Sequence, residues 1–131
     1  MDKPDILLDS DVMIEILRNN PKAIQWLLTQ RGKAIGLPVI VRMELVRGAR
    51  NRQEQRTIVR ELDKYETVHL ETGDTIKALK WFEDFYLSHG LGIMDCLIAA
   101  PAVRLRRPLY TFNVRHYRVI PGLDARIPFE R

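Results

Sequence analysis

Three carboxylates fall at positions that the hydrophobic pattern otherwise reserves for the protein interior. Asp9 closes an apolar run near the start of the chain. Glu44 shares a helical face with Ile40, and Asp95 shares one with Ile98, at the four- and three-residue spacing of a helix. An ionised carboxylate in apolar surroundings is costly unless a counter-charge is present. The three acids therefore either find separate arginine or backbone partners, or converge on a shared cation.

A shared cation would have to be a hard ion. Carboxylate oxygens without a cluster of His or Cys select magnesium or manganese rather than zinc. The three histidines, His69, His89 and His116, are scattered, and Cys96 is the only cysteine. A divalent ion held by carboxylates can ionise a water and neutralise a phosphodiester oxygen, so this chemistry is that of a hydrolytic nuclease.

The elements that must position these acids alternate between strands and helices. Short apolar runs at 4–9, 34–37, 67–70 and 108–111 predict strands, and the segments between them have helical periodicity. Such an order needs crossover connections, which favours an α/β fold with a short, mainly parallel sheet covered by helices on both faces. Sites in such sheets lie beyond the carboxyl ends of the strands, where Asp9 falls.

Length and composition indicate one ordinary globular domain over residues 1–131. Hydrophobic residues make up 46% and charged residues 29%, which excludes a disordered chain. Charges interrupt every apolar run, and the first residues lack the order of a signal peptide, so we expect no membrane association. The single cysteine excludes an internal disulfide, and we therefore expect a cytoplasmic protein.

The charge balance is mildly basic, with a formal net charge of +4 and 15 arginines among the 21 basic residues. Arginine suits phosphate because its planar donor fork matches the phosphate oxygens. The ridge formed by Arg52, Arg56 and Arg60 is interpreted as a solvated helix face. Five later arginines are expected to lie around the carboxylates and contact a nucleic acid: Arg104, Arg106, Arg107, Arg115 and Arg118.

Four segments together resemble the successive motifs of PIN-domain ribonucleases, specifically the VapC-type toxins of bacterial and archaeal toxin–antitoxin pairs. The segments read ILLDSDVMI from residue 6, VRMELVRGA from residue 41, GIMDCLIAA from residue 92 and YTFNVRHY from residue 110, the last followed by IPGL at 120–123. Each motif alone is weak. All four occur in the family's order, and together they span essentially the whole chain.

The resemblance implies a three-layer α/β/α PIN-like domain with endoribonuclease activity that depends on Mg²⁺ or Mn²⁺. It also implies an RNA substrate, a cognate antitoxin and a homodimer. By the same resemblance, Asp9, Glu44 and Asp95 would hold the metal and, with Asn113, form the catalytic site. Three further polar residues would support that site from behind: Ser10, Asp11 and Thr111.

Each acid also has a purely structural interpretation. Asp9 could be a strand-end cap, Asp95 a first-turn acid favoured by the helix dipole, and Glu44 the partner of a nearby arginine such as Arg42 or Arg47. Asp11 could equally cap the following helix or join the site. Pro101 lies inside the helix expected from about 93 to 106 and should kink it just past Asp95.

Two alternative functions are weighed against cleavage of RNA. Asp9 and the residues after it also resemble the start of haloacid-dehalogenase-type phosphatases, but that chemistry needs a lysine late in the chain, and none follows Lys80. The second alternative is a PIN-like module that binds RNA or a partner without cutting. It is motivated by Asn113, which lies where many family members carry a fourth acid.

Overall fold

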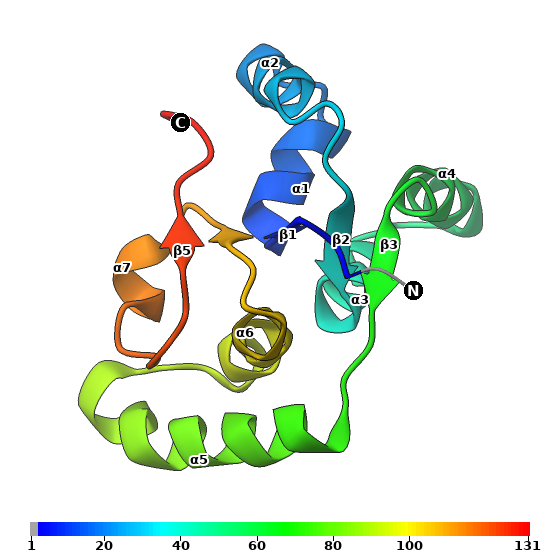
Figure 1. The fold of residues 1–131 in the computed structure, drawn as a ribbon. Coiled ribbons are helices and arrows are strands. Elements are labelled where there is room, and N and C mark those ends of the chain that lie inside the picture. Colours follow the sequence, from blue (N-terminus) through cyan, green and yellow to red (C-terminus); the bar gives the residue numbers. More distant parts are fainter. Residues whose placement is uncertain (1–2) are drawn as a thin grey trace.

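The computed structural model describes residues 3–131 and builds them around a five-stranded parallel sheet (Figure 1). The strand order is β3-β2-β1-β4-β5, so the first strand lies at the centre. The predicted α/β fold with a short parallel sheet is confirmed. The strands are β1 (Ile6–Leu8), β2 (Ile35–Pro38), β3 (Glu66–Val68), β4 (Leu109–Tyr110) and β5 (Ala125–Arg126).

Seven helices connect these strands within residues 3–131. None of them is both long and apolar enough to cross a membrane. The helices are α1 (Ser10–Leu17), α2 (Pro21–Thr29), α3 (Val39–Arg47), α4 (Arg52–Leu62), α5 (Thr72–His89), α6 (Ile93–Leu105) and α7 (Val114–Tyr117).

The strand order explains how the helices divide into two layers. From β1 to β3 the chain moves stepwise toward one edge of the sheet, and it then returns across the sheet to β4 and β5. Because crossovers between parallel strands are right-handed, reversing the direction moves the connecting helices to the opposite face. Figure 1 shows α1 and α2 on one side of the sheet and α5 and α6 on the other.

The core forms where both layers press on the central strand. Leu7 and Leu8 of β1 are completely buried, as a strand covered on both faces requires. Val41 and Leu45 of α3 and Ile98 of α6 are buried as well. The helical faces predicted from three- and four-residue spacing are thus the faces that pack.

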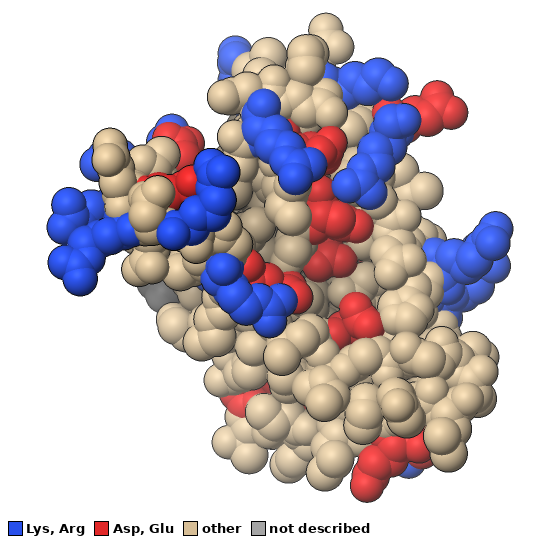
Figure 2. Space-filling model, turned by 180° about the vertical axis from the view of Figure 1, so that it is seen from behind, with Lys and Arg blue, Asp and Glu red and all other residues tan. Residues whose placement is uncertain are grey.

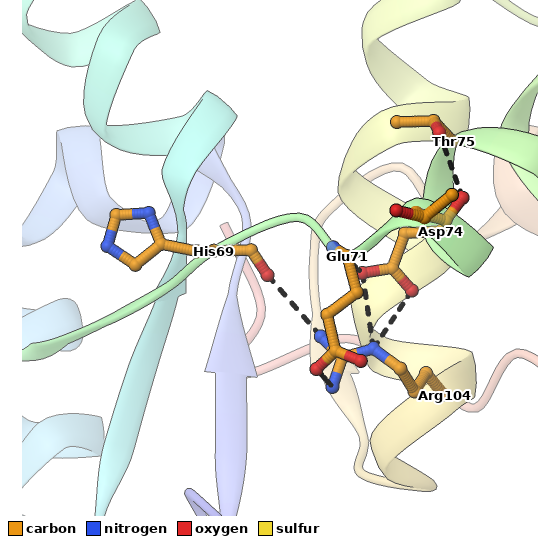
Figure 3. A network of polar contacts seen from close by, with 6 residues as sticks. His69, Glu71, Asp74, Thr75 and Arg104 are labelled. Atoms are coloured by element: carbon orange, nitrogen blue, oxygen red, sulfur yellow. Dashed lines mark hydrogen bonds and ion pairs between the residues drawn. The ribbon is translucent and has the colours of Figure 1, made fainter.

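The last two long helices, α5 and α6, pack across each other (Figure 1), and an ion-pair network joins them. Gly90 ends α5 in the left-handed conformation, with φ of +67°, and the chain turns back into α6. In the last turn of α6, the Arg104 guanidinium contacts Asp74 at 3.0 Å and Glu71 at 2.9 Å, and donates to the His69 carbonyl (Figure 3). Asp74 is almost fully buried, so this network ties the start of α5 to the end of α6.

Arg104, Arg106 and Arg107 do not lie where the sequence analysis expected them. Asp95 lies in the first turn of α6 and Arg104 in its last, about 13 Å apart along the axis at 1.5 Å per residue. Arg106 and Arg107 follow that end, and Arg107 donates to the Pro4 carbonyl. These three arginines therefore do not surround the carboxylates. The helix itself continues through Pro101 to Leu105.

Replacing Arg104 by alanine should destabilise the protein. The substitution leaves the Asp74 carboxylate buried without its counter-charge, which should lower the free energy of unfolding by about 2–4 kcal/mol in urea titrations. Arg50→Ala is the matched control, because within residues 3–131 Arg50 pairs only with Glu54, at the surface. It should cost no more than about 0.5 kcal/mol. Equal losses in the two variants would show that the network adds nothing.

Candidate active site

The strand order places a switch point between β1 and β4, where parallel sheets are expected to form a crevice. The chain leaves β1 toward one helical layer and leaves the neighbouring β4 toward the other. At such a point, the connections that follow two adjacent strands run to opposite faces of the sheet. Space for a ligand is therefore left beyond the carboxyl ends of those two strands. Asp9 follows β1 and Thr111 follows β4, so both lie at this switch point.

Asp9 is a buried carboxylate that forms no ion pair with residues 3–131. Its side chain is held by two donors: Oδ1 accepts from the Ser10 N–H at 2.7 Å, and Oδ2 accepts from the Thr111 hydroxyl at 2.9 Å. Burial, followed by the negative charge of Asp11, raises the pKa of Asp9 from 3.8 to about 6. Asp9 does cap α1, as its structural interpretation stated, but capping leaves its charge uncompensated.

Asp11 joins the same crevice from the first turn of α1. Its Oδ2 accepts from the Phe112 N–H at 3.0 Å and from the Thr111 hydroxyl at 3.4 Å, so it ties α1 to the end of β4. Its Oδ1 is buried and has no hydrogen-bond partner among residues 3–131. Burial raises the pKa of this carboxyl as well. Of the two roles left open for Asp11, the structure places it beside the site, since Asp9 is the cap.

Glu44 reaches the crevice from α3 through a single hydroxyl. Ser10 Oγ donates to Glu44 Oε1 at 2.6 Å, while the Ser10 N–H donates to Asp9. One residue therefore holds carboxylates from two distant segments. Arg42, suggested as a possible partner of Glu44, instead contacts Asp63 and Thr67. Glu44 is half-buried and forms no ion pair within residues 3–131.

Asp95 is fixed by one of its two oxygens. Oδ2 accepts from the Gly92 N–H at 2.9 Å and contacts Nε2 of His116, also at 2.9 Å. Gly92 permits this return, because a Cβ atom at that position would lie 2.8 Å from Oδ2. Asp95 is thus a first-turn acid of α6, as its structural interpretation stated. Its Oδ1, however, forms no hydrogen bond with residues 3–131, and its side chain is 27% exposed.

Two residues of α7 belong to this crevice but escaped the sequence prediction. His116 holds Asp95, and the buried Tyr117 hydroxyl lies close enough to Asp9 and Asp95 for both charges to raise its pKa, after burial. Both follow Asn113 by three and four residues, one helical turn, and that spacing is the signal that could have found them. Tyr117 therefore connects the surroundings of Asp9 with those of Asp95.

Asn113 and two of the predicted arginines line a hollow next to these residues. The hollow has a volume of about 440 Å³, and its wall includes Asn113, Arg115, His116 and Arg118. Asn113 is exposed, and its backbone N–H donates to the Thr111 hydroxyl. Arg115 and Arg118 are exposed and form no ion pair within residues 3–131.

Comparison with known proteins assigns this arrangement to a family. Residues 6–120 match the PIN domain. The chain belongs to the PIN-domain family. Ribonuclease VapC19 of Mycobacterium tuberculosis H37Rv is 31% identical over 122 residues, which cover 90% of this chain and 96% of that protein. Ribonuclease VapC10 of the same strain is 32% identical over 126 residues, 90% of each chain. The predicted resemblance to VapC-type PIN domains is confirmed.

Solved structures show the same fold over nearly the whole length. A toxin–antitoxin complex from Klebsiella pneumoniae contains a chain that aligns with a TM-score of 0.78 at 21% identity, covering 96% of this chain and 99% of that one. A DNA-bound VapBC structure from Salmonella typhimurium gives a TM-score of 0.80 at 18% identity, over 97% and 100% of the two chains. The three-layer PIN architecture is therefore retained here.

The donor chemistry of this PIN domain fits a hard cation, although a closed cage is not formed. Among residues 3–131, no three His, Cys, Asp or Glu side chains are grouped closely enough to hold a metal ion as they lie. The switch point nevertheless contains a buried, unpaired Asp9 and the buried, unpartnered Oδ1 of Asp11. Oxygen atoms of this kind match magnesium or manganese. Figure 2 shows acidic side chains gathered along a furrow with lysines and arginines around it.

Replacing Asp9 by asparagine should make metal-free protein more stable at neutral pH. Because the pKa of Asp9 is about 6 in the folded chain against 3.8, the folded state holds the proton more tightly, so stability falls as pH rises between these values. The resulting cost above pH 6 is about 3 kcal/mol, and the asparagine variant avoids it. We expect the difference in unfolding free energy between variant and wild type, measured in urea with EDTA, to grow from pH 4 to pH 7.5.

The matched control is Asp84→Asn, because Asp84 forms an exposed ion pair with Lys80. Its difference from wild type should stay nearly constant over the same pH range. A constant difference for Asp9→Asn as well would mean that the buried carboxylate carries no uncompensated charge.

Proposed function

We propose that this PIN domain is the toxin of a type II toxin–antitoxin pair and cleaves RNA as a Mg²⁺- or Mn²⁺-dependent endoribonuclease. The observation that carries the proposal is the convergence of Asp9, Asp11 and Glu44 on Ser10 and Thr111 at the switch point of the sheet. The identity to ribonucleases VapC19 and VapC10 supports the same reaction. Hydrolysis needs no side-chain nucleophile, and Cys96, whose pKa burial raises to about 11, is unsuited to be one.

Asp9, Glu44 and Asp95 are the proposed metal ligands, with Asn113 as the neutral fourth member of the catalytic site. When bound, the ion would supply an activated water and neutralise charge on the scissile phosphodiester. Ser10 holds one oxygen of Glu44, and His116 holds one oxygen of Asp95. The other oxygen of each carboxylate has no hydrogen bond within residues 3–131. The proposed role of these donors is to orient carboxylates.

The RNA is proposed to lie over the acidic furrow, with its phosphates near the basic side chains around it. Arg115 and Arg118 are the arginines whose position suits phosphate contacts, because they border the hollow beside Asp95 and have free guanidinium groups in the part of the chain described. Arg104, Arg106 and Arg107 are left out of this surface because they lie at the other end of α6. Phosphate contacts of this type should make RNA binding weaken with salt.

Cleavage should require the metal and each carboxylate. With a structured transcript as substrate, EDTA should abolish cutting, and Mg²⁺ or Mn²⁺ should restore it. Asp9→Asn and Asp95→Asn should each reduce the rate by at least about 100-fold, and Ser10→Ala, which only frees Glu44, by about 10- to 100-fold. The readout is product formation on denaturing gels, with circular dichroism to verify folding.

Asp63→Asn is the control for the cleavage assay, since Asp63 is exposed and pairs with Arg42 away from the switch point. It should cut at the wild-type rate. Folded wild-type protein that binds a panel of transcripts but cuts none with either metal would replace the nuclease proposal by the non-cleaving binding module.

We propose a homodimer formed through the outer face of the α5 and α6 pair. Ile76 and Leu79 of α5 and Ile93 of α6 expose 57–65% of their surface beside one another, an apolar face that isolated soluble proteins seldom leave uncovered. A second copy covering the same face would bury it symmetrically. The antitoxin is proposed as a separate partner, supported by the toxin–antitoxin complexes among the similar structures.

Light scattering on purified protein should give twice the monomer mass, and Leu79→Glu should shift it to the monomer by placing a charge in the interface. Leu28→Glu is the control, because Leu28 is similarly exposed but lies on α2 in the opposite layer. Its dimer should remain intact. A monomeric wild-type protein at micromolar concentration, or dissociation in both variants, would overturn this assignment.

A further inference from the structure

The hollow beside Asp95 contains an aromatic ring that the proposed cleavage does not use. His89, the last residue of α5, lies on the wall of the hollow together with Arg115, Arg118 and Asn113 of the segment around α7. Figure 1 shows the end of α5 passing beneath α7. A helix end and a short helix that are distant in sequence therefore enclose one space next to the carboxylates.

The His89 ring is held in a fixed orientation although it is exposed. Its Nδ1 contacts the Ser88 hydroxyl at 2.7 Å, and its ring meets that of Phe85 edge-on, with centroids 5.8 Å apart and planes at 85°. Both contacts favour this orientation of the ring. An exposed, pre-oriented aromatic ring is the type of surface on which nucleobases stack.

The charge of the hollow suits a phosphate next to such a base. Arg115 and Arg118 contribute two guanidinium groups that form no ion pairs with residues 3–131. Its volume of about 440 Å³ falls in the range of about 300–1,000 Å³ typical of small-ligand pockets. The hollow therefore offers a ring for a base, two cations for a phosphate and room for a small ligand. These features together suit one nucleotide.

We propose that this hollow is a subsite for a single unpaired nucleotide of the RNA, with the base stacked on His89 and its phosphate held by Arg115 and Arg118. This inference rests on the proposed function and deepens it. The neighbouring His116 contacts Asp95, so a nucleotide bound here lies next to the proposed cleavage site. A base inside a duplex keeps its faces stacked on its neighbours, so the substrate class is single-stranded RNA or an unpaired loop.

The subsite is tested by binding without cleavage. The probe is a short, unstructured, fluorescent RNA whose riboses are 2′-O-methylated, in buffer with EDTA, and its dissociation constant is measured by anisotropy. His89→Ala should weaken binding about 5- to 50-fold through loss of stacking. Arg118→Ala should weaken it too and lower the slope of its salt dependence by about one. Arg31→Ala, an exposed arginine beyond the end of α2, should change nothing.

A conservative variant separates stacking from a general loss of structure. His89→Phe keeps an aromatic face and should bind the probe within about threefold of wild type, whereas His89→Ala should not. The same sequence as a duplex should bind more weakly and be insensitive to His89→Ala. Unchanged affinity in His89→Ala, equal losses in the phenylalanine and alanine variants, or competition by an acidic peptide but not by unlabelled RNA, would overturn the subsite.

The outcome is independent of cleavage. If the wild type binds the probe through His89 and yet cuts no transcript with added metal, the subsite stands and the nuclease proposal fails. If transcripts are cut at the wild-type rate and KM by His89→Ala protein, the nuclease proposal stands and the subsite fails.

Discussion

The buried negative charge of Asp9 is the constraint around which this PIN domain is arranged. The residue directly follows the central strand, where its carboxylate is buried, and Asp11 adds a second charge instead of relieving the first. A sequence selected for stability alone would place a neutral or paired group here. The backbone and hydroxyl donors around Asp9 keep the carboxylate in place, but they do not neutralise it.

The donors around Glu44 and Asp95 share one geometric property. Ser10 contacts one oxygen of Glu44, and Gly92 and His116 contact one oxygen of Asp95. In each case the second oxygen is left without a hydrogen bond from residues 3–131. Holding a carboxylate by one oxygen fixes its direction and preserves a ligand, which is how supporting residues commonly act around metal ions. The dominant cost of the site is therefore electrostatic rather than conformational.

Much of the fold could be predicted from sequence because it depends on local patterns. The strand at 4–9 and the helical faces around Glu44 and Asp95 follow from hydrophobic spacing, and the strand–helix alternation determines a parallel sheet. The buried Asp74 was not foreseen, because its partner Arg104 is thirty residues away and nothing local marks the pair. The same long-range pairing misled the placement of Arg104, since a late position in sequence is not proximity to the site. The roles of the site residues remain predictions for the assays.

The short connection between α5 and α6 carries a restriction of a different kind. It contains only Gly90, the buried Leu91 and Gly92, with His89 directly before it and Asp95 one helical turn after it. One residue more would displace the ring relative to the carboxylate by up to about 3.8 Å, more than stacking or ligation tolerates. Among relatives that share both features, this loop should therefore keep its length, and insertions and deletions should be confined to other loops.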